Sequence, residues 1–182
     1  MIKRNKVLLA MVLAAVVLFQ CGAGSSDQTG ERPQHWATAV EHPGLPNLYK
    51  ISADLYRGAQ PDKAGIEELK KMGIKTIISF RTSNEDQELI KGYTFNYYHL
   101  SMNAFFPKKE KYSRFLVIVS DPANLPAFIH CKHGADRTGA AVALYRIKIQ
   151  KWNPEEAINE MVNGGYRFHK IHSHLKNFVR KF

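Results

Sequence analysis

The sequence predicts an α/β fold in which helices flank a mainly parallel central sheet. Short runs rich in β-branched and aromatic residues alternate with segments of helical periodicity along most of the chain. This order is expected when the connections between parallel strands are helices. The chain has 182 residues, enough for one domain with its own core, and its content of 45% hydrophobic and 23% charged residues is ordinary for a soluble globular protein. We find no internal repeat.

Caps and hydrophobic runs predict the elements in the first half of the fold, which we expect to begin near Leu45. Asp62 has the character of a helix N-cap, and the helical pattern that follows it stops at Gly73. The β-branched run over 74–80 predicts a buried strand. The other elements predicted here are a short strand within 53–61, a short helix over 84–90 and a strand over 94–100.

The second half of the chain predicts one more core strand, over 126–130, between helices. A helix is expected over 107–121, and an apolar helix over 138–150. Asn153 as the cap and Pro154 at the first helical position predict a helix over 153–162, and a last helix is expected over 169–182. Ligands of open α/β sheets bind beyond the carboxyl ends of the strands. The residues that follow 126–130 are therefore the expected place for a site.

The first 23 residues predict an export signal. Basic residues precede an unbroken apolar run over 7–19, and small and polar residues follow it, a pattern that is short for a bilayer span. Cys21 stands where a bacterial lipoprotein signal has its lipid-modified cysteine, although Gln20 replaces the usual small residue. Cleavage after Ala23 by an ordinary signal peptidase is an equal alternative, and a retained, uncleaved anchor is a third.

These patterns divide the chain into three parts. Residues 1–23 are expected to be a signal peptide or lipoprotein signal, 24–44 a linker rich in Gly, Ser, Pro and His, and 45–182 the folded domain. The expected location is outside the cytoplasm, in the periplasm or cell envelope, with membrane attachment through the N-terminus as one alternative. The oligomeric state stays open.

The chain is basic, with a formal net charge of +10. Such a charge is compatible with nucleic acid, an anionic membrane surface or a negatively charged substrate. The basic residues are spread along the chain and no nucleic-acid-binding motif accompanies them. We therefore expect no nucleic-acid partner.

The segment 130–139, "HCKHGADRTG", is the strongest functional signal, and we call it the signature loop. Cys131 follows a predicted strand and precedes a predicted helix, so backbone N–H groups and the helix dipole are expected to form an anion-binding nest around it. Gly134 allows a close approach of the backbone to a ligand. Arg137 offers a planar fork that matches two phosphate oxygens. The same positive field stabilises a thiolate, which is the nucleophilic form of cysteine.

This arrangement of a cysteine, five residues, an arginine and a threonine resembles the protein tyrosine and dual-specificity phosphatase superfamily. The segments "LYRGAQP", "GIKTIISFR" and 131–161 resemble its compact bacterial dual-specificity members. The resemblance implies the cysteine phosphatase fold and a cysteinyl-phosphate intermediate that water hydrolyses, with no metal or other cofactor. It further implies that Thr138 hydrogen-bonds the Cys131 sulfur and that His130 shapes the loop.

The candidate residues follow from the loop and from this resemblance. The expected substrates are phosphoproteins or, as the alternative, phosphoinositides and inositol phosphates. The candidate catalytic residues are Cys131, Arg137, Asp136 and Thr138, and the candidate substrate-binding residues are Lys132, His133, Gly134, Ala135, Asp136 and Arg137.

The general acid that protonates the leaving oxygen has several candidates in this sequence. The family usually has an aspartate in the region where this chain has Asn103, and no Asp occurs between residues 89 and 120. The remaining candidates are Asp136 within the loop, Glu110, Glu85 and Asp86. We favour Asp136, for which the alternative role is a helix N-cap.

Three other interpretations have to be weighed. His169, His172 and His174 are close together in the predicted last helix, and a solvated helix face is favoured over a metal site. A rhodanese-like sulfurtransferase also uses a cysteine in an anion loop, but the Arg-Thr-Gly continuation argues against it. A non-catalytic phospho-binding module would be expected to lack Cys131 or Arg137, and both are present.

Overall fold

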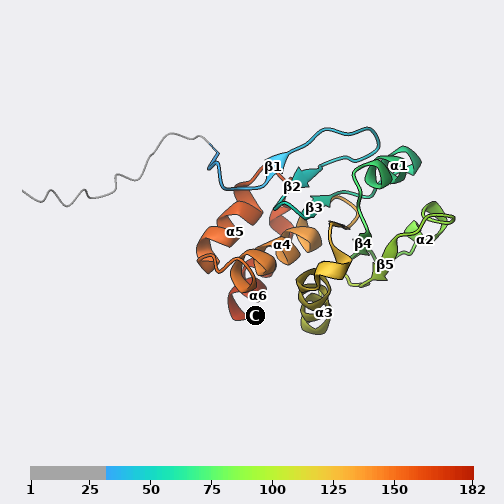
Figure 1. Ribbon diagram of the computed structural model, residues 1–182. Coiled ribbons are helices and arrows are strands. Elements are labelled where there is room, and N and C mark those ends of the chain that lie inside the picture. Colours follow the sequence, from blue (N-terminus) through green and yellow to red (C-terminus); the bar gives the residue numbers. More distant parts are fainter. Residues whose placement is uncertain (1–31) are drawn as a thin grey trace, which may run out of the picture. The chain divides into compact units, whose positions relative to one another are not determined.

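The computed structural model describes residues 32–182 and has a six-stranded sheet in the order β1-β2-β3-β6-β4-β5 (Figure 1). The four strands β3, β6, β4 and β5 are parallel to one another, and β1 and β2 are added antiparallel at one edge. The α/β fold with a mainly parallel sheet is therefore confirmed. The strands are β1 (Thr38–Ala39), β2 (Tyr49–Lys50), β3 (Leu55–Gly58), β4 (Thr76–Ser79), β5 (Asn96–His99) and β6 (Ala127–His130).

Helices connect the parallel strands and cover the sheet (Figure 1). No helix within 32–182 has both the length and the apolar character needed to cross a bilayer. The α-helices are α1 (Lys63–Lys71), α2 (Asp86–Leu89), α3 (Lys109–Ser120), α4 (Asp136–Lys148), α5 (Pro154–Asn163) and α6 (His174–Lys181), with 3-10 turns η1 (Pro122–Asn124) and η2 (Lys170–His172).

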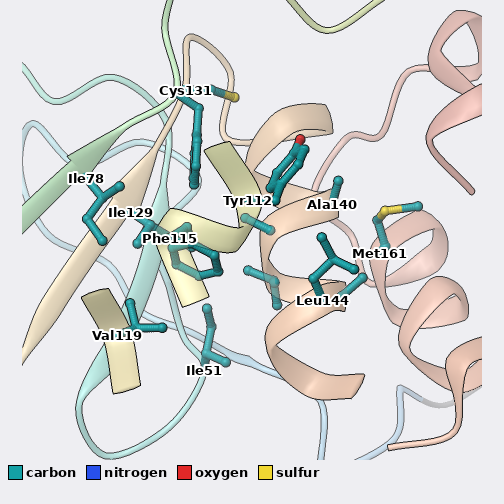
Figure 2. Packing of buried hydrophobic residues seen from close by; sticks show 14 of the residues in the cluster. Ile51, Ile78, Tyr112, Phe115, Val119, Ile129, Cys131, Ala140, Leu144 and Met161 are labelled. Carbon is teal, nitrogen blue, oxygen red and sulfur yellow. The ribbon is translucent and has the colours of Figure 1, made fainter. Parts of the chain in front are cut away.

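The two faces of the sheet bury separate cores because side chains alternate along each strand. In β4, Ile77 packs with Ile66 and Leu69 of α1, whereas the next residue, Ile78, packs in the larger core on the opposite face. Figure 2 shows this larger core, with Ile78 and Ile129 of the sheet against side chains of α3, α4 and α5. The continuous apolar runs of β4 and β6 are explained by this burial on both faces.

The described residues that precede Leu45 pack with the domain, whereas the sequence predicted that the fold begins near Leu45. Trp36 and Ala37 are buried, and the Ala37 N–H donates a hydrogen bond of 2.7 Å to the Glu160 carboxylate. That carboxylate is also paired with Arg146 between α4 and α5. Residues 32–44, assigned above to the linker, are thus part of the domain. The predicted signal over 1–23 lies outside the described residues.

Several element boundaries differ from the prediction, while the predicted caps are confirmed. Asp62 accepts a hydrogen bond from Gly65 N at the start of α1, and Asn153 caps α5 with Pro154 as its first residue. The helix after the signature loop begins at 136, two residues before the prediction, and the last helix begins at 174 because 170–172 form a 3-10 turn. The two-residue strands β1 and β2 were not predicted, since two residues show no periodicity.

Candidate active site

The parallel strands bring four connections to one edge of the sheet. In the register of the sheet, Gly58 and Ser79 both lie opposite His130, and His99 lies opposite Ser79. The segments that follow these residues therefore meet around the signature loop. This is the edge at which open α/β folds bind ligands.

Cys131 is the first residue after β6 and is only 2% exposed. Figure 2 shows it at one end of the large core, with the Tyr112 ring of α3 nearby. The Tyr112 hydroxyl donates to the Arg137 carbonyl at 3.2 Å, which ties α3 to the first turn of α4. Burial raises the Tyr112 pKa far above its ordinary value, so this phenol stays protonated and acts as a donor. Tyr112 therefore joins the core next to Cys131 to the helix that carries Arg137.

The backbone N–H groups of the signature loop are free for the predicted anion-binding nest. The backbone N–H groups of 132–137 make no hydrogen bond to other described residues, and the first bond of the helical ladder runs from Gly139 N to Ala135 O at 2.8 Å. These N–H groups lie at the N-terminus of the 13-residue helix α4, whose dipole favours negative charge there. Ala135, a predicted substrate-binding residue, is fully buried and occupies the N-cap position.

Gly134 is required by the close approach of strand β3. Its φ is +68°, a value that residues with a side chain rarely adopt. A Cβ at this position would lie 2.4 Å from the Gly58 carbonyl oxygen. Any larger residue would therefore separate the loop from the end of β3.

Arg57 of β3 supports the backbone of the signature loop. It was not among the residues predicted from the sequence. It is fully buried, donates to the Gly134 carbonyl at 2.6 Å and stacks on the Tyr166 ring at 3.7 Å. Burial lowers the Arg57 pKa, while Tyr166, Glu160 and Cys131 oppose the shift. The sequence feature that could have indicated this role is an arginine within the predicted strand segment "LYRGAQP". Charged residues are seldom buried unless they are paired, so an arginine there suggests a specific partner.

Two main-chain carbonyls hold the guanidinium of Arg137. Its Nη1 donates to the oxygens of Phe80, which follows β4, and Met102, which follows β5, each at 3.1 Å. The hydrogen bonds that it makes to described residues use only Nη1. Nε and Nη2 are therefore available for two oxygens of an anion.

Thr138 is fully buried in the first turn of α4. Its hydroxyl has no hydrogen-bond partner among the described residues, so the bond to the Cys131 sulfur implied by the family resemblance is not formed in this structure. The role predicted for Thr138 in the second step stays a prediction.

His130, the last residue of β6, lies in a buried polar network next to the signature loop. Its Nε2 is 3.5 Å from the Asp86 carboxylate, which also accepts from Gln60 at 2.6 Å and Tyr97 at 3.1 Å. Burial lowers the His130 pKa to about 4, although Asp86 opposes this shift. His130 is therefore neutral at pH 7.

The three acidic alternatives outside the loop have other surroundings. Asp86 is fully buried in the network behind the loop, and Glu85 is paired with Arg81 through both carboxylate oxygens. Glu110 is exposed in the first turn of α3. None of the three lines the pocket beside the signature loop.

Asp136 is the first residue of α4 rather than its N-cap. Its Oδ1 accepts from the His169 backbone N–H at 2.9 Å, and its Oδ2 is 2.8 Å from His169 Nδ1. The side chain is 9% exposed. Both carboxylate oxygens are thus used by one residue that is 33 positions away in the sequence.

A basic pocket of about 530 Å³ opens beside the signature loop. The predicted substrate-binding residues Lys132 and His133 line it, and Asn47 donates to the His133 carbonyl at 2.9 Å. Arg167 and His169 also line it. The pocket can accept an anionic or aromatic group attached to a phosphate held in the loop.

The three clustered histidines do not share a helix face as predicted. His169 and His172 precede α6 and His174 is its first residue. His169 pairs with Asp136, and His174 Nε2 is 3.0 Å from the Ala104 carbonyl. Within 32–182, no three residues of the types His, Cys, Asp and Glu form a group able to hold a metal.

The fold and the signature loop together define a cysteine-based phosphatase. Residues 46–180 match the family model described as "DSP-PTPase phosphatase fused to NAD+ Kinase". The chain therefore belongs to this family of dual-specificity-type phosphatase domains.

Individual relatives agree with this assignment. The dual specificity protein phosphatase TpbA of Pseudomonas aeruginosa strain PAO1 is 32% identical over 162 residues, which are 88% of this chain and 72% of TpbA. A cysteine-to-serine variant of TpbA solved in complex with phosphotyrosine has a TM-score of 0.70 at 30% identity, covering 82% of this chain and 91% of that one. The Saccharomyces cerevisiae inositol diphosphatase SIW14 is 28% identical over 119 residues, 59% of this chain and 41% of SIW14. The chain is a phosphatase that cleaves phosphomonoesters through a cysteinyl-phosphate intermediate.

Proposed function

We propose that this phosphatase hydrolyses phosphorylated side chains of proteins, phosphotyrosine among them, with Cys131 as the nucleophile and Arg137 as the phosphate-binding side chain. One observation carries the proposal. The N–H groups of 132–137 have no acceptor among the described residues at the N-terminus of α4, beside Cys131 and an arginine anchored by two carbonyls. An anion with several oxygens matches this set of donors.

In the proposed chemistry, the loop N–H groups and Arg137 stabilise the negative charge on the phosphoryl oxygens. The Cys131 thiolate attacks phosphorus while the loop N–H groups and the free nitrogens of Arg137 hold the equatorial oxygens. The ester oxygen leaves, and water then hydrolyses the cysteinyl phosphate. Among relatives with 30% identity or more, TpbA has been solved with phosphotyrosine, which supports phosphotyrosine as a substrate here.

A turnover panel tests the substrate class. We expect the domain over 32–182 to release phosphate from a phosphotyrosine peptide faster than from a phosphothreonine peptide or an inositol phosphate at equal concentration. Phosphate release from the inositol phosphates alone would contradict the proposal. A thiosulfate-to-cyanide sulfurtransferase assay on the same protein is the control for the rhodanese-like alternative.

The basic pocket favours a second candidate function on inositol phosphates. Lys132 and Arg167 would attract further phosphate groups next to the one that is cleaved, and SIW14 is named as an inositol diphosphatase. Arg167→Gln provides the discriminating variant, since Arg167 is exposed at the pocket. A KM that rises for inositol phosphates and not for the phosphotyrosine peptide would favour this candidate.

We further propose that the chain is exported to the periplasm or cell envelope and that Cys21 is its lipid attachment site. The support is the basic start, the apolar run over 7–19 and the cysteine that follows it. Cys21→Ala and inhibition of lipoprotein signal peptidase should each abolish labelling by a fatty-acid analogue. A mature protein that begins at Gly24 without lipid would contradict the lipid attachment, and a protein that keeps Met1 in the cytoplasm would contradict export.

A further inference from the structure

The loop that usually supplies the general acid contains no acid in this chain. Asn103 occupies the expected region, and its Oδ1 accepts a hydrogen bond from the Phe105 backbone at 2.8 Å. An amide does not release a proton near neutral pH. The leaving oxygen therefore needs a proton from another element.

The geometry of Asp136 is that of an acceptor. The His169 backbone N–H donates to one oxygen, and the ring Nδ1 lies at hydrogen-bond distance from the other. An ionised carboxylate can only accept, so Nδ1 carries a hydrogen and the tautomer of the ring is set. The catalytically useful nitrogen of this pair is then His169 Nε2.

His169 lines the pocket beside the signature loop. Its side chain is 45% exposed and lines the pocket that also contains Lys132 and His133 of the signature loop. The His169 and His133 rings are 5.3 Å apart. Among the described residues none is hydrogen-bonded to Nε2 of His169, so this nitrogen is free to contact an ester oxygen.

The pKa values of two neighbouring histidines are lowered, so these rings are less often protonated near neutral pH. Burial lowers the pKa of His133, as do the nearby His169 and Lys132. Burial also lowers the pKa of His172, helped by His174, His169 and Arg137 and opposed by Asp136. Within the described residues, only His169 has a ring nitrogen at hydrogen-bond distance from a carboxylate of the signature loop. The charged and titratable groups around His169 are Asp136 and Arg137 of α4, Lys132 and His133 of the signature loop, His172 of η2 and Arg167 of its own segment.

We propose that His169 is the general acid and base of this phosphatase and that Asp136 is a positioning residue that orients its ring. This inference rests on the proposed function and moves the acid role predicted for Asp136 to its partner. The Asp136–His169 pair is an arrangement in which a buried carboxylate sets the tautomer of a catalytic histidine.

His169 gives up one proton in the first step and regains one in the second. In the first step the S–P bond of Cys131 forms, the P–O ester bond breaks, and the leaving oxygen takes the proton of His169 Nε2, which leaves a neutral imidazole. In the second step that imidazole accepts a proton from water while the water oxygen attacks phosphorus. The P–S bond breaks, Cys131 returns as a thiolate, phosphate leaves, and His169 is again protonated.

The leaving group provides the test. An acid matters in proportion to how poorly the group leaves. His169→Gln should slow the hydrolysis of phenyl phosphate by about 10²–10⁴-fold. The hydrolysis of difluoromethylumbelliferyl phosphate, which has a good leaving group, should slow much less. In the wild-type protein, kcat for phenyl phosphate should fall with rising pH as the imidazole loses its proton. This fall should be absent from the pH profile of His169→Gln. Asp136→Asn should show the same selectivity to a smaller degree.

His174→Gln is the matched control, because His174 lies in the same histidine cluster but bonds the Ala104 carbonyl rather than Asp136. Turnover of the activated ester reports folding in each variant. Equal losses on both esters in His169→Gln would overturn the proposal, as would a selective loss in Asp136→Asn or His133→Gln with His169→Gln unaffected. A wild-type protein that hydrolyses neither ester would overturn the proposed function itself, whereas one that hydrolyses both without selectivity in His169→Gln overturns only this inference.

Discussion

Cys131→Ser is expected to lower turnover by about 10⁴-fold or more, the scale that loss of a nucleophile has in other hydrolases, while phosphate and vanadate still bind. A serine hydroxyl beside the same donors stays protonated and is a far weaker nucleophile than a thiolate. The nest and Arg137 do not depend on the sulfur, since their contacts run through backbone groups. Steady-state turnover and isothermal titration with vanadate measure the two effects.

The substitution is small enough to separate chemistry from folding. Cys131 is almost completely buried, and serine replaces a single atom. Thermal unfolding with and without vanadate provides the control, because ligand binding to the folded state raises the melting temperature. Substantial turnover by the serine variant would contradict the covalent mechanism.

The parts of the site that are local in sequence could be predicted from the sequence. The nest, Gly134 and Arg137 all lie within ten residues of one another, and a strand before them and a helix after them determine their geometry. The same holds for Asp62 and Asn153, because a helix cap depends on residues two or three positions away. The order of strands and helices followed from hydrophobic periodicity for the same reason.

The parts that depend on tertiary packing could not be predicted. Arg57 reaches Gly134 across 77 positions, and His169 reaches Asp136 across 33. A pattern search of a single sequence sees neither pair, so Asp136 could only be considered alone, as an acid or as a cap. The packing of 32–44 against the domain was missed because Ala37 and its partner Glu160 are separated by 123 positions.

Arg137→Lys is expected to reduce kcat by about 10²–10³-fold, the loss typical of a removed transition-state donor, although the charge is kept. Arg137 uses Nη1 for the Phe80 and Met102 carbonyls and has Nε and Nη2 left for two phosphoryl oxygens. A lysine has one nitrogen, so it either keeps the two carbonyls or turns to the phosphate. Steady-state kinetics on an activated aryl phosphate measure the loss, and Arg114→Lys on the exposed side of α3 should leave kcat unchanged. Near-normal turnover by the lysine variant would mean that the two free nitrogens do not contact the transferred group.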